Sequence, residues 1–112
     1  MSQLTTHILD TTRGKPAQGI SITLYQQRNN EWIQKANGIS NAEGRIVDFL
    51  NKDMLLEFGI YKLKFNTREY FDILSIESFY PYIEIAFEIN TNSHYHVPLL
   101  LNPFGYSTYR GA

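Results

Sequence analysis

Three segments of the chain alternate apolar and polar residues with a period of two. In residues 20–25, Ile and Leu alternate with Ser, Thr and Tyr; in residues 61–65, aromatic residues and Leu alternate with Lys. In residues 83–89, Ile and Phe alternate with Glu and Ala. Successive strand side chains point to opposite faces, so each segment presents an apolar face to a core and a polar face outward. The pattern predicts an all-β protein, a two-sheet β-sandwich of about eight short strands.

Polar segments between the strands predict turns. Arg28-Asn29-Asn30 is expected to close a hairpin between a strand ending near Gln27 and a strand starting at Trp32. Asn41-Ala42-Glu43-Gly44 predicts a tight turn in which Gly44 takes the position that needs a permissive φ. Asn37-Gly38 fits either a turn or a bulge, and both interpretations stay open.

One segment changes to a helical period. Tyr70, Ile73 and Leu74 have the spacing i, i+3, i+4, which predicts a helix over about 67–76. Asn66 and Glu69 are spaced as a capping box at its start. The sandwich is therefore expected to carry one short helix.

Composition narrows the class of protein. The 112 residues predict a single domain, 1–112, and the absence of cysteine excludes disulfides and thiolate metal sites. A formal net charge of −1 without a basic stripe argues against nucleic acid as a partner. No apolar run approaches the ~20 residues that span a bilayer, so no membrane association is expected. Residues 1–7 lack the features of a signal peptide. A cytoplasmic location is expected, or a periplasmic one if a signal has been removed.

The candidate acid–base groups are few. His94 and His96 are two residues apart in a predicted strand, so both point to the same face. Together with His7 they raise the hypothesis of a zinc site, which is disfavoured because no nearby carboxylate or conspicuous second shell supports it. Pro98 is expected to place its segment at a sheet edge or a bulge, because proline cannot donate to a ladder. Taken singly, each histidine and Arg45 is more often a structural or solvated group.

Three blocks in the same order resemble a known family. They are THILDTTRGKPA at 6–17, NAEGR at 41–45 and HYHVPLLLNPFGYSTYRG at 94–111. The chain resembles the 5-hydroxyisourate hydrolases of the transthyretin-like family over nearly its whole length. The resemblance implies a transthyretin-like sandwich and the hydrolysis of 5-hydroxyisourate to 2-oxo-4-hydroxy-4-carboxy-5-ureidoimidazoline in urate breakdown. It also implies a homotetramer, a dimer of dimers, with active sites where the dimers meet.

The resemblance also implies which residues act. His7, Arg45 and His96 correspond to the catalytic set, His7 and Arg45 also contact substrate, and His94 is expected to be structural. The substrate site is completed from the tail by Tyr109, Arg110 and Gly111. A neutral imidazole can take a proton from water, and a guanidinium can stabilise charge developing on a carbonyl oxygen, so no metal or cofactor is expected. Either His7 or His96 can be the base.

The last residue of the chain differs from the usual family sequence. The family usually ends Tyr-Arg-Gly-Ser, whereas this chain has Ala112 at the last position. If the serine hydroxyl only hydrogen-bonds substrate, its loss costs about 1–2 kcal/mol, or roughly tenfold in rate. The alternative function is a non-catalytic or weakly active transthyretin-like protein that binds a small molecule. The carrier branch of the family lacks the combination of His7, Arg45, His96 and the Tyr-Arg-Gly tail.

Overall fold

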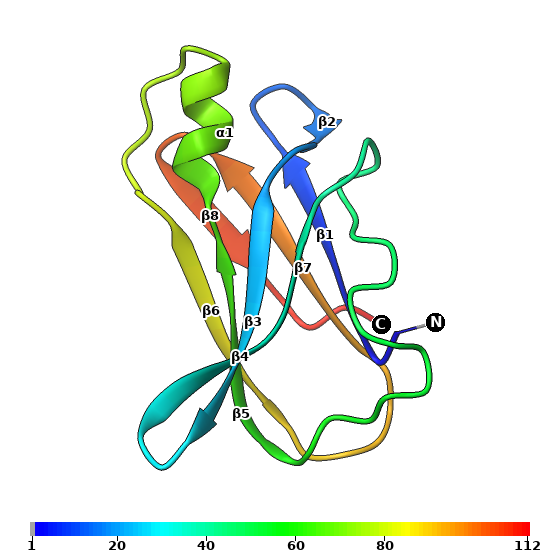
Figure 1. Ribbon diagram of the computed structural model, residues 1–112. Coiled ribbons are helices and arrows are strands. Elements are labelled where there is room, and N and C mark those ends of the chain that lie inside the picture. The colour runs from blue at the N-terminus through cyan, green and yellow to red at the C-terminus, as the bar shows by residue number, and fades with distance from the viewer. Residues whose placement is uncertain (1) are drawn as a thin grey trace.

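Two four-stranded sheets form a β-sandwich in the computed structural model, which describes residues 2–112 (Figure 1). One short helix, α1, lies at one end of the sandwich. The elements are β1 (Leu4–Asp10), β2 (Lys15–Pro16), β3 (Ser21–Arg28), β4 (Glu31–Ile39), β5 (Gly59–Phe65), α1 (Thr67–Ile73), β6 (Ile83–Ile89), β7 (Tyr95–Asn102) and β8 (Gly105–Thr108). The predicted two-sheet sandwich of about eight strands with one short helix is confirmed.

The first and the penultimate strands lie side by side. One sheet has the order β2-β1-β7-β8 and the other the order β4-β3-β5-β6. β1 and β7 run parallel, and the other pairs of named strands are antiparallel. This pairing brings the first block of family-like sequence next to the last one.

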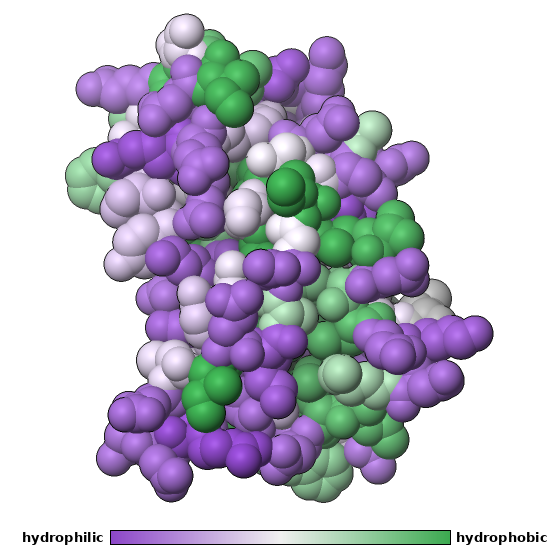
Figure 2. All heavy atoms as spheres, viewed as in Figure 1, coloured by the Kyte–Doolittle hydropathy of each residue, from purple (hydrophilic) through white to green (hydrophobic). Residues whose placement is uncertain are grey.

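The three alternating segments form strands, as predicted. Ile22 and Leu24 of β3, Leu63 of β5 and Ile83 of β6 are buried between the sheets. The burial alternates along β1 as well, with every second side chain inside from Leu4 onward. Some large apolar side chains remain outside, and Figure 2 shows them gathered in patches between polar areas on the face that it views.

Both predicted turns are present. β3 ends at Arg28 and β4 begins at Glu31, within one residue of the expected bounds. The two residues between them, Asn29 and Asn30, have φ values of 53° and 64°, which suit a hairpin turn with both central residues left-handed. In the second turn, Gly44 has φ 75° and its N–H donates to the Asn41 carbonyl at 2.9 Å.

The segment Asn37-Gly38 is neither a turn nor a bulge. Both residues pair regularly with β3, and the irregularity in this hairpin lies instead between Leu24 and Tyr25. A Cβ at Gly38 would lie 2.8 Å from a methyl carbon of Ile46, so the glycine serves the close packing of that side chain.

The helix starts at Thr67, as predicted, but it is shorter than predicted and lacks the expected cap. It ends at Ile73, because the chain turns back at Ser75, which has φ 58°. The predicted capping box is wrong, since Asn66 makes no side-chain bond to the first turn. Tyr70 is buried as the spacing implied, but Ile73 is 82% exposed and Phe71 is buried in its place.

Pro98 lies in an interior strand, which corrects the expectation of an edge or a bulge. β7 is flanked by β1 on one side and β8 on the other. The ladder with β8 begins at the pair Leu99–Thr108, one residue beyond the proline. The Pro98 carbonyl accepts a hydrogen bond from the Thr108 hydroxyl at 2.7 Å, so this carbonyl points toward β8. The N–H and C=O of one strand residue point to the same side, so the proline nitrogen, which has no hydrogen to donate, also faces β8. The tail therefore leaves the ladder where the proline offers no donor.

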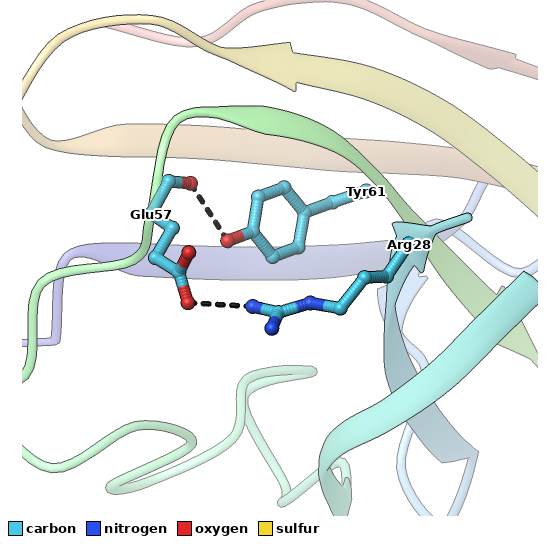
Figure 3. Close-up of polar contacts among 3 residues, drawn as sticks. All are labelled: Arg28, Glu57 and Tyr61. Carbon is cyan, nitrogen blue, oxygen red and sulfur yellow. Dashed lines mark hydrogen bonds and ion pairs between the residues drawn. The ribbon is translucent and has the colours of Figure 1, made fainter.

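A polar cluster fixes the loop before β5. Figure 3 shows Arg28 and Tyr61 reaching different atoms of Glu57. The Arg28 guanidinium pairs with the Glu57 carboxylate at 2.7 Å, and the Tyr61 hydroxyl donates to the Glu57 carbonyl at 2.7 Å. Both charged side chains are largely exposed, so the ion pair contributes at most about 1 kcal/mol.

Among residues 2–112, no helix has the length and apolar character needed to cross a membrane.

Candidate active site

His7 lies on the outer face of the sheet formed by β2, β1, β7 and β8, because it alternates with the buried neighbours Thr6 and Ile8. The turn that carries Arg45 is attached beside it. Arg45 forms an antiparallel bridge with His7, and the Ile8 N–H donates to the Gly44 carbonyl at 2.9 Å. The turn thus sets the arginine next to the histidine.

His96 lies on the same face from the neighbouring strand. It is the partner of Thr5 in the parallel β1–β7 ladder, and His7 is the partner of Pro98. Paired residues point to the same side of a sheet, so His96 lies on the side of Thr5. Thr5 and His7 are two residues apart on β1 and share the outer face, so His96 lies on that face too. His7, His96 and the turn residue Arg45 therefore lie on the same face of this sheet.

Electrostatics keep both histidines neutral. Burial lowers the pKa of His7, the Arg45 charge lowers it further, and the Glu43 carbonyl opposes the change. Burial and then Arg45 lower the pKa of His96, and the other two imidazoles act in the same direction. An imidazole ordinarily titrates near 6.5, so at neutral pH both rings are in the form that accepts a proton.

Two glycines allow the main chain to approach these rings. A Cβ at Gly111 would lie 2.5 Å from Cδ2 of His96, and the Gly111 N–H donates to the His96 carbonyl at 2.8 Å. A Cβ at Gly44 would collide with the Ile8 carbonyl and lie 3.3 Å from Cδ2 of His7. The structure therefore places Gly111, predicted as a substrate contact, against the edge of a site histidine.

The other tail residues lie at the edge of the sandwich. Tyr109 and Arg110 line a cavity of about 330 Å³ between the tail and β6, and His96 also borders it. Tyr109 is 59% exposed. The Arg110 guanidinium lies 4.6 Å from the centre of the Tyr95 ring, which points to the opposite side of the sheet from His96. Within one chain, these two residues thus share a cavity with His96, and neither His7 nor Arg45 borders that cavity.

Sequence reasoning missed Thr5 and assigned no role at the site to Gly44. The Thr5 hydroxyl is hydrogen-bonded to both His94 and His96. The alternation along β1 places Thr5 on the same face as His7, but no pattern in the sequence indicated its contacts with His94 and His96. A separate cavity of about 440 Å³ between α1 and the β1–β2 connection is lined by Arg13 and Lys15, and none of the predicted site residues borders it.

The described residues 2–112 give the zinc hypothesis no support. Across residues 2–112, no group of three or more His, Cys, Asp or Glu side chains is arranged to hold a metal ion. One ring nitrogen each of His94 and His96 is hydrogen-bonded to the same hydroxyl.

Fold and site together define a transthyretin-like β-sandwich with two neutral imidazoles and a guanidinium on the open face of one sheet. The chain belongs to the HIUase/Transthyretin family, whose model matches residues 4–111.

Individual relatives are similar over nearly the full length. A probable 5-hydroxyisourate hydrolase of Schizosaccharomyces pombe is 45% identical over 113 residues, covering 97% of this chain and 90% of the relative. The 5-hydroxyisourate hydrolase of Klebsiella pneumoniae is 39% identical with a TM-score of 0.82, covering 100% of this chain and 94% of that one. Sea bream transthyretin in complex with thyroxine is 28% identical with a TM-score of 0.91, covering 98% and 95%.

Proposed function

We propose that this protein is an enzyme that hydrolyses 5-hydroxyisourate to 2-oxo-4-hydroxy-4-carboxy-5-ureidoimidazoline in urate degradation. The observation that carries the proposal is the placement of His7, Arg45 and His96 on one face, in a chain 39–45% identical to proteins named for this activity. The product is the substrate plus water, so the reaction needs a base and charge stabilisation but no redox partner.

Each of the three groups has a part in the proposed chemistry. A neutral imidazole, His7 or His96, removes a proton from water as the oxygen adds to a ring carbonyl. The Arg45 guanidinium stabilises the negative charge that develops on the carbonyl oxygen. The carbon–nitrogen bond then breaks, and the imidazolium returns its proton to the departing nitrogen. This scheme uses no metal or cofactor.

A small-molecule carrier is the alternative function. Backbone similarity does not separate the two, because the TM-score to the thyroxine-bound transthyretin, 0.91, exceeds that to the hydrolase, 0.82. Sequence identity runs the other way, 28% against 39%. The polar face also favours the enzyme: an apolar ligand would have to be buried against two imidazoles and a guanidinium, whose desolvation costs free energy.

Assembly into a homotetramer, a dimer of dimers with active sites between the dimers, belongs to the same proposal. One support is that the sheet face that carries His7 is not covered by another part of this chain at Arg45, whose side chain is exposed. Large apolar side chains also stay exposed, among them Val47 at 73% and Ile39 at 66%. Such groups commonly mark interfaces. Tyr109 and Arg110 would then contribute to substrate binding from the tail at the sandwich edge.

The test is the ultraviolet decay of 5-hydroxyisourate, generated in the cuvette from urate and urate oxidase, with and without this protein. We expect decay well above the spontaneous rate. His7→Ala is expected to lower kcat by roughly 10²–10⁴-fold, and Arg45→Ala by roughly 10²–10³-fold. Arg28→Ala is the matched control, because it removes an exposed arginine from the other sheet and should leave the rate unchanged.

The outcomes are distinct. A well-folded protein that gives no acceleration contradicts the enzyme proposal and favours the carrier. Sedimentation of a monomer at the assay concentration, with full activity, would retain the enzyme but refute the site between dimers.

A further inference from the structure

A single hydroxyl links two of the three histidines. The Thr5 Oγ1 lies 2.8 Å from Nδ1 of His96 and 2.9 Å from Nε2 of His94. The two imidazole rings are stacked, with centroids 6.4 Å apart and planes inclined by 18°. His96 is half-buried and His94 is exposed. The hydroxyl therefore sits between an inner ring at the proposed site and an outer ring at the surface.

The hydroxyl cannot donate to both rings at once. It carries one proton, whereas each neutral imidazole has one N–H and one bare nitrogen. In one arrangement Thr5 donates to His96 and accepts from His94, which leaves the His96 proton on Nε2. In the other, His96 donates from Nδ1 and Thr5 donates to His94, which leaves Nε2 of His96 bare. Only the second lets His96 accept a proton from water at Nε2.

The proposed chemistry requires the second arrangement. A general base must present a bare nitrogen to water. The Thr5 hydroxyl occupies Nδ1 of His96, so Nε2 is the nitrogen that remains to act, and it is bare only when the proton is on Nδ1.

We propose that Thr5 is a positioning residue that, with His94 as its acceptor, holds His96 in the Nδ1–H form. The hydrogen bonds then run from His96 Nδ1–H to Thr5 Oγ1 and from the Thr5 hydroxyl to His94 Nε2. This inference rests on the proposed function for its catalytic consequence: it makes His96, with its bare Nε2, the base that takes the proton from water. In this chain of hydrogen bonds His94 takes part only as the acceptor of the Thr5 hydroxyl.

The first test needs no substrate. Nitrogen-15 NMR of the imidazoles, at a pH where the rings are neutral, reads directly which nitrogen of His96 carries the proton. We expect Nδ1 in the wild type and in Thr5→Ser, and a mixture of both forms in Thr5→Val, which keeps the β-branched shape but not the hydroxyl. Thr23→Val, the same change on β3 of the other sheet, is the control and should leave His96 unchanged. Wild-type His96 protonated on Nε2, or Thr5→Val retaining Nδ1, overturns the proposal.

The second test is kinetic. Thr5→Val is expected to lower kcat roughly tenfold with KM nearly constant and to move the acid limb of the pH profile, whereas Thr5→Ser restores both. His94→Phe keeps a stacked ring without an acceptor and is expected to change kcat only about twofold, because Thr5 still accepts from His96. A Thr5→Val enzyme with wild-type kcat and pH profile refutes the positioning role. If the wild type does not act on 5-hydroxyisourate, the proposed function fails, while the NMR result still decides the proton position.

Discussion

Replacing Gly111 with alanine tests whether the tail positions His96. The added Cβ would lie 2.5 Å from Cδ2, 3.1 Å from Cγ and 3.2 Å from Cβ of the histidine, whereas ordinary contacts begin at 3.4 Å. Relief therefore requires a movement of about 1 Å by the ring or the tail, and a misplacement of that size can cost about 100-fold in rate. We expect kcat for 5-hydroxyisourate to fall by that order.

Stability should change much less than activity. The hydrogen bond at risk is that from the Gly111 N–H to the His96 carbonyl, 2.8 Å long, which is worth about 1 kcal/mol. Gly105→Ala is the matched control, since its Cβ would lie 3.6 Å from the nearest atoms, in ordinary contact. The ultraviolet decay assay and a thermal melt are read together. If the kcat values of Gly111→Ala and Gly105→Ala are both within twofold of the wild-type value, the reasoning is refuted.

Four further predictions follow from the charges and packing described above. Arg45→Gln removes a charge that lowers the pKa of both site histidines, so both pKa values rise and the acid limb of kcat/KM moves to higher pH; unchanged values in an NMR titration contradict this. Gly44→Ala should lower the free energy of unfolding in urea by more than Gly14→Ala. Both glycines have a positive φ, which costs an alanine about 1–2 kcal/mol. Only at Gly44 would the added Cβ also collide with a main-chain atom, the Ile8 carbonyl oxygen. Equal losses of stability in the two variants would show that this close contact is unimportant. Tyr70→Phe removes a 2.7 Å hydrogen bond to a buried carboxylate and should cost about 1–3 kcal/mol in the same assay, and a neutral effect would contradict it. Ala112→Ser should raise kcat up to roughly tenfold in the ultraviolet decay assay, and an unchanged kcat would show that the hydroxyl does not contact substrate.

Much of the fold could be predicted because the sheet pattern is local. Alternating residues such as those of β5 and β6 report directly which face is buried, and the Asn29–Asn30 turn follows from residues that tolerate positive φ. The errors arose where tertiary contacts decide. Ile73 has helical spacing, yet the helix ends there and Phe71 takes the buried position. Pro98 is tolerated in an interior strand because its missing donor faces the point where the tail leaves.

The site was predictable only in part. His7, Arg45 and His96 were identified through the family resemblance, and the β1–β7 pairing explains why such distant positions meet. Thr5 carries no signal of its own, because a threonine in a strand is usually no more than a favourable strand residue. Its connection to two histidines depends on a register that the alternation pattern does not specify.

The parallel pairing of β1 with β7 also has a consequence for the order in which the protein forms. Thr5 and His96 are separated by 91 positions along the chain, so their contact closes a loop that contains most of the protein. Contacts of such separation form late, after local hairpins have reduced the entropy of the loop. A growing polypeptide can build the β3–β4 hairpin early, but it has no catalytic face until the penultimate strand has been synthesised and has joined the first. The residues of the proposed catalytic face thus come together only late in folding.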